Sequence, residues 1–327
     1  QEPPSRRSQP VGGLVELRQQ RRRRDAEFRL GELHAKPPVV HIETSACGSS
    51  PDKEWSLMEA RHADACVPPL QVFLPLPPME AQCVVAQTAC EAMDVGGFAL
   101  LEAPTGTGKT LAVLGTVLAW QWSKVTDPAG PTAEPPPPRV LWVARTHEQL
   151  LHAVHEFRRL PYRPLMSLRL SRERFCLLPT VRSARNKAEA CEIATTISPQ
   201  SVACSSKGNK KGSKGSKSSK GGSGGKGPQP SGCSYLEHAE AMRYPQAPEH
   251  LRRFELGGPL ATYDIEDLVR EAQAMHICPY HTVGDLSMEG AGLIFMTYNQ
   301  LLDPLVRFAG GYEPLIQDAI IAVDEAH

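Results

Sequence analysis

The sequence has no long apolar run, no net charge and no closely spaced cysteine pair. No stretch approaches the ~18 apolar residues of a membrane-spanning helix, so we expect no membrane span, and no secretory signal is visible. Lys plus Arg and Asp plus Glu both number 36, so the overall charge indicates neither an acidic nor a basic partner. The nine cysteines include no Cys-x-x-Cys pair, so their spacing alone does not predict a zinc site.

Proline and glycine are abundant, at 30 and 26 residues, which predicts long irregular segments. The 327 residues, 41% of them apolar, are enough for about two domains around a real core. The sequence begins with Gln1 and ends at His327, inside a motif described below, so we expect it to be a fragment of a longer protein.

Two segments have compositions that cannot bury much apolar surface. Residues 1–70 are rich in Pro, Gln and Arg, and we expect this N-terminal region to be largely disordered. Its run Arg21–Arg24 fits either a nuclear-import or nucleic-acid patch or a solvated face. Residues 205–232 consist mostly of Gly, Ser and Lys, so we expect a disordered insert. Its lysines either keep a flexible loop in solution or neutralise DNA phosphates without reading bases.

The strongest motif is a phosphate-binding loop. It consists of Ala103, Pro104, Thr105, Gly106, Thr107, Gly108, Lys109 and Thr110. An apolar run at 97–101 precedes it and an apolar helical stretch at 111–122 follows it, which is the strand–loop–helix context of such loops. Glycine lets backbone N–H groups approach phosphate oxygens closely. Lys109 can contact the β- and γ-phosphates, and the Thr110 hydroxyl can ligate Mg²⁺. The first position is Ala103 where Gly is usual, so the loop is a variant.

A second motif follows the apolar run 319–323, which is typical of a buried parallel strand. Asp324 comes directly after this run and can hold Mg²⁺, and Glu325 can accept a proton from an attacking water. Two more apolar runs, at 140–144 and 292–296, bring the number of expected strands to four with the one before the phosphate loop. We therefore expect an α/β fold with a parallel sheet and ligands at the carboxyl ends of its strands.

Five of the cysteines lie between the strands expected at 140–144 and 292–296. They are Cys176, Cys191, Cys204, Cys233 and Cys278. This interval is too long for a simple crossover connection, so it predicts an inserted domain. Thiolates there could bind zinc or an iron–sulfur cluster, or they are unligated buried thiols.

Seven segments, in order, resemble those of XPD-like superfamily 2 DNA helicases. They are residues 103–110, 144–150, 171–176, 264–269, 276–280, 297–303 and 324–327. The resemblance covers Phe73 to His327 and is strongest to the group that contains the regulator of telomere elongation helicase and the FANCJ helicase. It implies that residues 71–327 are an incomplete first RecA-like motor domain, with an inserted iron–sulfur domain at 171–280 that includes the insert 205–232.

The resemblance also implies the function. It indicates an ATP-dependent DNA helicase that uses Mg²⁺ and ATP to move along single-stranded DNA, from 5′ to 3′, and to unwind forked DNA. It implies a role in DNA repair or telomere maintenance, in the nucleus. In this family a second motor domain supplies an arginine finger, so we expect the fragment itself to be inactive.

Particular residues take roles from the same resemblance. A [4Fe–4S] cluster is expected on Cys176, Cys191, Cys233 and Cys278. Cys204 competes with Cys191 for the second position, and Cys191 is favoured because Cys204 opens the expected disordered insert.

Two further roles follow from the family motifs. Gln82 matches the glutamine that reads adenine, although Met79 stands where the family usually has Tyr. Arg145, Thr146 and His147 match a segment that contacts the DNA backbone. Two other functions remain open: a metal-bearing P-loop ATPase that acts on protein, and a truncated, non-catalytic product that binds ATP or DNA.

Overall fold

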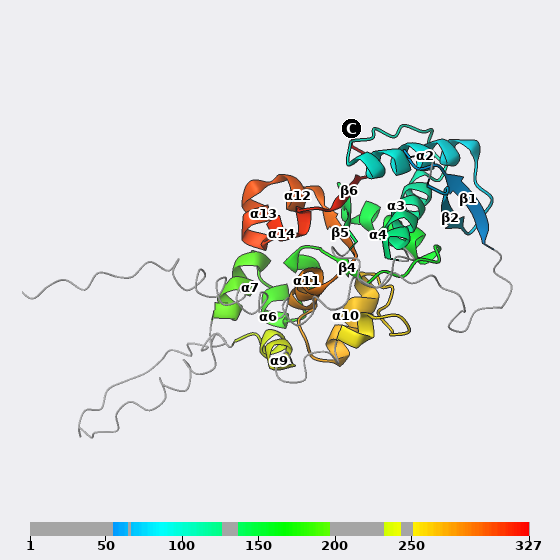
Figure 1. Ribbon diagram of the computed structural model, residues 1–327. Helices are drawn as coiled ribbons and strands as arrows, with labels where there is room; N and C mark the ends of the chain where they lie inside the picture. Colours follow the sequence, from blue (N-terminus) through cyan, green and yellow to red (C-terminus); the bar gives the residue numbers. More distant parts are fainter. Residues whose placement is uncertain (1–54, 65–66, 126–136, 197–231, 243–250, 327) are drawn as a thin grey trace, which may run out of the picture. The chain divides into compact units, whose positions relative to one another are not determined.

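The computed structural model describes residues 55–64, 67–125, 137–196, 232–242 and 251–326 (Figure 1). Contacts divide the chain into two compact units: unit 1 is Gln1–Leu168 with Gly284–His327, and unit 2 is Arg169–Val283. The predictions for residues 1–54, including Arg21–Arg24, and for most of the Lys-rich insert fall outside the described residues, as do Cys204 and His327. No described helix is long and apolar enough to span a bilayer.

The centre of unit 1 is a four-stranded parallel sheet with the strand order β4-β5-β3-β6. Its strands are β4 (Met166–Leu168), β5 (Leu293–Thr297), β3 (Val140–Ala144) and β6 (Ile320–Val323). All five residues of β3 are buried, as expected for a strand paired on both sides and covered on both faces. Three of the four strands coincide with predicted apolar runs, and the predicted α/β class with a parallel sheet is confirmed.

The predicted strand at 97–101 is wrong. These residues form no strand, and the side chains of Phe98 and Leu100 are fully and 90% exposed. An apolar run becomes a strand only where a neighbouring strand offers hydrogen bonds and other side chains cover it, and this run has neither in the structure. The fourth strand is β4 instead, whose three residues are too few to stand out in the sequence. Its buried Ser167 shares a hydrogen bond of 2.6 Å with Ser287.

Helices cover both faces of this sheet (Figure 1). They are α3 (Lys109–Val125), α4 (His147–Arg158), α12 (Tyr298–Leu302) and α14 (Glu313–Ile316), whereas α2 (Glu80–Val95) packs against α3, and α13 (Pro304–Gly310) packs against α12. Leu141 and Val143 of β3 pack with Leu315 of α14, whereas Phe157 of α4 lies 6.1 Å from the ring of Phe295 on β5. Because side chains alternate along a strand and Phe295 pairs with Trp142, α4 lies on the opposite face from α14.

A small antiparallel pair, β1 (Ser56–Ala60) and β2 (Leu70–Leu74), precedes α2. Met58 and Ala60 are buried on alternate positions, so residues 56–60 are ordered, contrary to the disorder predicted for residues 1–70. Gly115 of α3 lets this helix approach β2 closely, since a Cβ there would lie 3.0 Å from a methyl group of Leu74.

Unit 2 is helical in its described residues. Its elements are α5 (Arg172–Phe175), α6 (Pro179–Arg182), α7 (Lys187–Thr196), α9 (Ser234–Met242), the 3-10 helix η1 (Leu251–Phe254), α10 (Ile265–Ala274) and the start of α11 (Pro279–Glu289). A small core gathers Val181, Cys191, Ala194, Cys233 and Leu236. Cysteines thus form part of one of the apolar cores of this unit.

Candidate functional site

The phosphate loop lies directly before α3, with two glycines in the left-handed region. Gly106 has φ +83° and Gly108 has φ +68°. A Cβ on Gly108 would lie 2.5 Å from Nε2 of Gln82, whereas a Cβ on Gly106 would meet nothing within 4 Å. Backbone conformation therefore requires glycine at both positions, and the close approach of Gln82 adds a second requirement at Gly108.

Hydrogen bonds to neighbouring residues hold this loop in place. Nζ of Lys109 donates to the carbonyl of Ala103 at 2.6 Å, and the Thr107 hydroxyl donates to Pro104 at 2.8 Å. The buried Gln82 donates from Nε2 to the Gly108 carbonyl at 3.3 Å and accepts from the backbone N–H of Met79 at 3.0 Å. Gln82, predicted to read adenine, thus fastens α2 to the phosphate loop, a contact that sequence reasoning did not identify.

The two acidic residues predicted for catalysis follow β6. The backbone N–H of Asp324 donates to the Val143 carbonyl at 2.8 Å, which continues the pairing of β3 with β6. Glu325 is exposed and has φ +54°, so the chain turns sharply after Asp324. The Tyr298 hydroxyl donates to the carbonyls of Asp324 and of Glu325, the latter at 2.9 Å, and so anchors this turn.

Electrostatics connects this turn to the phosphate loop. Burial, and then the charge of Glu325, raise the pKa of Asp324, while His152 and Lys109 act in the opposite sense. The charge of Lys109 thus reaches Asp324, although it is the weakest of these influences. Thr110, the second residue of α3, follows Lys109 in the helix.

The segment predicted to contact DNA follows β3. Arg145 is exposed, and its charge lowers the pKa of Tyr298, which burial and the charges of Asp324 and Glu325 raise. Thr146 is the N-cap of α4: its hydroxyl accepts from the N–H of Gln149 at 3.2 Å, and Oε1 of Gln149 accepts from the N–H of Thr146 at 3.0 Å. This capping box explains Thr146 in structural terms that the sequence analysis did not consider.

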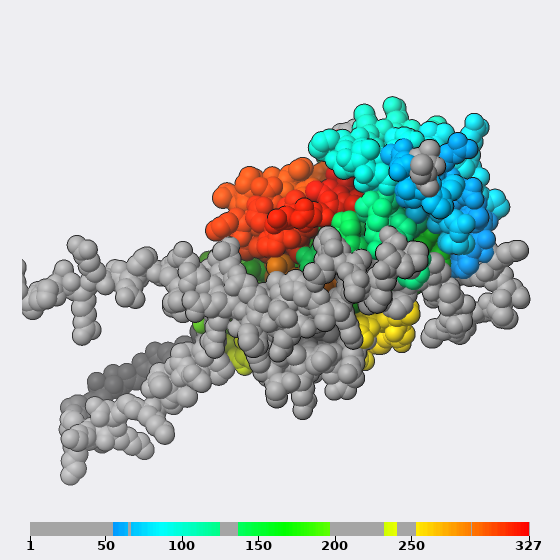
Figure 2. Space-filling view, in the orientation of Figure 1, coloured from blue at the N-terminus to red at the C-terminus, as the bar shows by residue number. Residues whose placement is uncertain are grey.

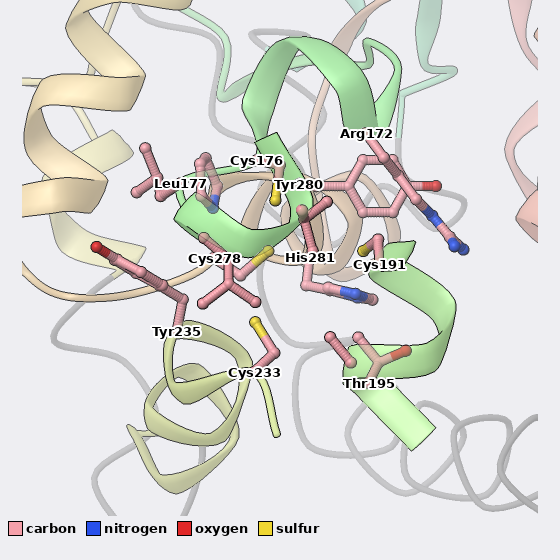
Figure 3. A pocket seen from close by; sticks show the side chains of 14 residues that line it. Arg172, Cys176, Leu177, Cys191, Thr195, Cys233, Tyr235, Cys278, Tyr280 and His281 are labelled. Atoms are coloured by element: carbon pink, nitrogen blue, oxygen red, sulfur yellow. The ribbon is translucent and has the colours of Figure 1, made fainter. Parts of the chain in front are cut away.

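Four cysteines of unit 2 line one pocket (Figure 3). Cys176 ends α5, Cys191 lies in α7, and Cys233 and Cys278 precede α9 and α11. Backbone bonds position two of them, because the N–H of Cys233 donates to Ala194 and that of Cys278 to Tyr235, each at 3.0 Å. All four are free thiols. Cys191 is therefore among the converging residues, whereas its competitor Cys204 lies outside the described part.

The surroundings of these thiols keep them neutral unless a cation binds among them. Burial raises the pKa of each thiol, that of Cys278 to about 12. Neighbouring thiolates raise the pKa further at Cys191, Cys233 and Cys278. Four mutually repelling buried thiolates need positive charge to ionise together, which a metal centre supplies.

No three of the four cysteines, all of them in the described part of the chain, have sulfur atoms that all lie within 4.8 Å of one another. Sulfur atoms on one tetrahedral zinc ion lie about 3.8 Å apart. Among the described residues, the only group of three metal-ligating side chains with ligand atoms within 4.8 Å of one another is His62, Cys90 and Asp94, in unit 1. The cysteines of unit 2 therefore surround a wider space than one zinc ion fills.

Comparisons with known proteins agree with these features. Residues 142–327, more than half of the chain, match the family model DEAD_2. The regulator of telomere elongation helicase 1 homolog of Drosophila willistoni is 28% identical over 291 residues, 79% of this chain and 25% of that protein. The human regulator of telomere elongation helicase 1 is 27% identical over 286 residues, 78% of this chain and 20% of that protein. The chain thus spans a quarter or less of these relatives' length.

Among solved structures, a truncated XPD is similar with a TM-score of 0.38 and 16% identity. The match covers 76% of this chain and 52% of that one.

Proposed function

The chain belongs to the DEAD_2 family of XPD-like superfamily 2 helicases, and on this premise we propose that it is the ATP-binding part of an ATP-dependent DNA helicase. The observation that supports this most is the phosphate loop itself: Gly106 and Gly108 take left-handed conformations directly before α3, and the charge of its Lys109 reaches Asp324 after β6. A nucleoside triphosphate with its metal ion needs a cation for the phosphates and a carboxylate for the metal at one place.

The chemical roles follow from this arrangement. Backbone N–H groups of Ala103, Thr105, Gly106, Thr107 and Gly108, at the N-terminus of α3, cradle the phosphates, while Pro104, which has no N–H, shapes the loop. Lys109 leaves its bond to the Ala103 carbonyl and neutralises the β- and γ-phosphates. The Thr110 hydroxyl and Asp324 hold Mg²⁺, and Glu325 accepts the proton of the attacking water. Gln82 is the residue proposed to contact adenine.

The proposed nucleic-acid contacts lie at the same edge of the sheet. Arg145, Thr146 and His147 follow β3 and contact phosphates of single-stranded DNA, which fixes position without reading sequence. Hydrolysis then drives movement from 5′ to 3′ and the opening of forked DNA. The relatives named for telomere elongation support telomere or genome maintenance, and therefore a nuclear location.

For unit 2 we propose a [4Fe–4S] cluster on Cys176, Cys191, Cys233 and Cys278. The four free thiols, their shared pocket and their wide spacing fit such a cluster better than one zinc ion. When bound, the cluster supplies four iron–thiolate bonds that cross-link α5, α7, α9 and α11. The guanidinium of Arg172, whose charge lowers the pKa of Cys191, favours the thiolate form there.

The test measures binding of a fluorescent ATP analogue with Mg²⁺ to the full chain and to Lys109→Ala. We expect the change to reduce affinity at least tenfold, because the phosphates lose their main cation in a partly shielded site. Lys124→Ala, in the last turn of the same helix, is the matched control and should bind as the wild type does. Equal affinity of Lys109→Ala and the wild type would show that the phosphate-loop assignment is wrong.

A second measurement separates a helicase from an ATPase that acts on protein. Single-stranded DNA should bind to the wild type, and Arg145→Ala should weaken that binding across all sequences, with a smaller salt dependence. Failure of the chain to bind DNA at low salt would favour the protein-remodelling alternative.

A further inference from the structure

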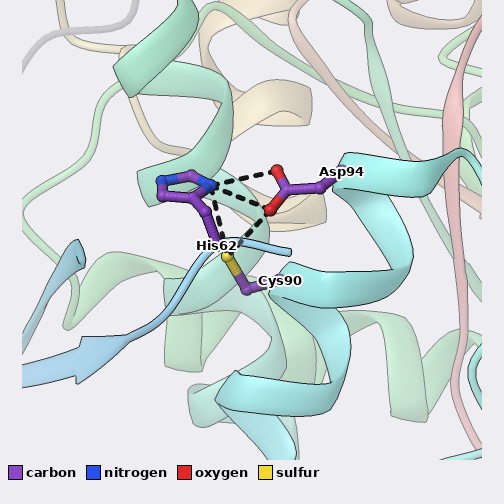
Figure 4. Close-up of side chains that lie close together, drawn as sticks. All are labelled: His62, Cys90 and Asp94. Atoms are coloured by element: carbon purple, nitrogen blue, oxygen red, sulfur yellow. Dashed lines mark hydrogen bonds and ion pairs between the residues drawn. The ribbon is translucent and has the colours of Figure 1, made fainter. Parts of the chain in front are cut away.

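Three potential metal ligands meet in unit 1, apart from both sites described above (Figure 4). His62 follows β1, whereas Cys90 and Asp94 lie one turn apart on the same face of α2. Cys90 is fully buried, and the side chains of His62 and Asp94 are 8% and 13% exposed. Sulfur, nitrogen and carboxylate oxygen are the donor types that zinc binds.

The distances between the ligand atoms suit one tetrahedral ion. Sγ of Cys90 lies 3.8 Å from Nδ1 of His62 and 4.0 Å from Oδ2 of Asp94, and Nδ1 lies 2.9 Å from Oδ2. On zinc these edges would be about 3.6, 3.6 and 3.4 Å. Each edge therefore needs to change by about 0.5 Å or less, which a small rotation of the side chains achieves.

The surroundings hold the carboxylate in the orientation a ligand needs. Nε1 of Trp120, on α3, donates to Oδ1 of Asp94 at 2.8 Å. The N–H of Ala63 donates to Oδ2 at 2.9 Å, which leaves this oxygen a second lone pair. Outer hydrogen bonds of this kind orient ligating carboxylates in metal sites. A surface cleft lined by His62 and Ala63, but not by Cys90 or Asp94, reaches the histidine side of the group.

We propose that His62 Nδ1, Cys90 Sγ and an oxygen of Asp94 bind one zinc ion, with water in the fourth position. The proton that bridges Nδ1 and Asp94 leaves, and the neutral imidazole keeps a proton on Nε2. Burial, and then the charge of Asp94, raise the pKa of the Cys90 thiol to about 12, so zinc must also displace the thiol proton. The ion links the β1 segment to α2, and through Trp120 to α3, the helix that begins at the phosphate loop.

Cobalt(II) is the probe, because its absorption reports thiolate ligation directly. The full chain, its Cys90→Ser variant and its Cys83→Ser variant are titrated with Co²⁺ under anaerobic conditions. Cys83 lies on the same helix outside the group, so it is the matched control. We expect Cys90→Ser to lose one Co²⁺ equivalent and one thiolate-to-cobalt charge-transfer band, and Cys83→Ser to keep both.

The difference spectrum between wild type and Cys90→Ser isolates this site from the cysteines of unit 2. Repeating it in a Cys191→Ser background should give the same difference. His62→Gln serves as a second variant and should weaken Co²⁺ binding at least tenfold, and Zn²⁺ should displace the cobalt. Unchanged stoichiometry and spectrum in Cys90→Ser and His62→Gln, with both variants folded by circular dichroism, would show a metal-free hydrogen-bond network and overturn the proposal.

Discussion

Gly106 and Gly108 share a left-handed backbone but differ in their surroundings, and this difference is testable. Gly108→Ala should lose about 1–3 kcal/mol of stability or displace Gln82, because its Cβ would collide with the Gln82 amide. Gly106→Ala carries a similar backbone cost without a collision. Chemical denaturation and nucleotide binding of both variants separate the two effects. Equal stability and equal nucleotide affinity of the two variants would show that the contact between Gly108 and Gln82 does not contribute to stability.

We expect the charge of Asp324 to have opposite effects on stability and on ligand binding. The ionised carboxylate lowers the stability of the fold, but it favours Mg²⁺-dependent nucleotide binding. Its pKa is raised in the fold, so deprotonation costs stability at neutral pH, and this cost disappears as pH falls below the pKa of the unfolded carboxyl. Asp324→Asn should therefore raise the Tm of the nucleotide-free chain at about pH 8 and lose this advantage near about pH 4. The same change should weaken Mg²⁺-dependent nucleotide binding.

Thermal unfolding by circular dichroism across this range measures the stability effect. Asp318→Asn, at an exposed position just before β6, is the control and should show no such trend. A lower Tm for Asp324→Asn at neutral pH would contradict the proposed destabilising charge.

At the scale of elements, sequence reasoning succeeded where the signal is local. The apolar runs at 140–144, 292–296 and 319–323 predicted β3, β5 and β6, because a strand covered on both faces needs apolar side chains at successive positions. It failed at 97–101 and at β4. Whether a segment becomes a strand depends on which other strand lies beside it, and the residues of the segment itself do not determine this.

The candidate sites show the same division. The phosphate loop is a contiguous motif, so its residues could be found directly, and its glycine conformations agree with it. The group of His62, Cys90 and Asp94 joins positions 28 and 32 residues apart, so only the fold brings them together. In the sequence, the only indication of this group is the spacing of four residues between Cys90 and Asp94, which lie on one helix. Two potential ligands at this spacing do not predict a metal site without a third such as His62.

A prediction about unit 2 tests whether Cys191 or Cys204 is the second ligand of the proposed cluster. Cys191→Ser should release iron, because it removes one of four converging thiols from α7, whereas Cys204→Ser should retain it. Iron and acid-labile sulfide per chain, after anaerobic purification, measure the outcome together with visible absorption. Iron loss in Cys204→Ser alone would move the second ligand to Cys204, and zinc without sulfide would replace the cluster by a zinc site.

On the scale of the whole molecule, exposed apolar side chains gather at α12 and α13, whose segment is orange to red in Figure 2. Leu302, Leu305 and Phe308 are 66%, 80% and 66% exposed. Exposed patches of this kind promote association. We expect Leu305→Glu with Phe308→Glu to reduce self-association in light scattering at rising concentration, with little change in Tm because both side chains are exposed.

The control for this surface is Leu301→Glu. Leu301 is only 8% exposed and belongs to the core beside β5, so a charge there should lower the Tm by burying an unpaired carboxylate. Unchanged self-association in the double variant would show that association, if any, proceeds through another surface.

Gln82 has a consequence for base recognition. Both ends of its amide are engaged, one with the Met79 N–H and one with the Gly108 carbonyl. An adenine that takes these hydrogen bonds replaces existing ones, so the net attraction is small. The same exchange detaches the phosphate loop from α2, so that reading the base and freeing the loop become a single event. Binding of adenine would then release the phosphate loop from α2. Discrimination between adenine and guanine nucleotides would therefore be measurable as a difference in the mobility of the loop as well as in affinity.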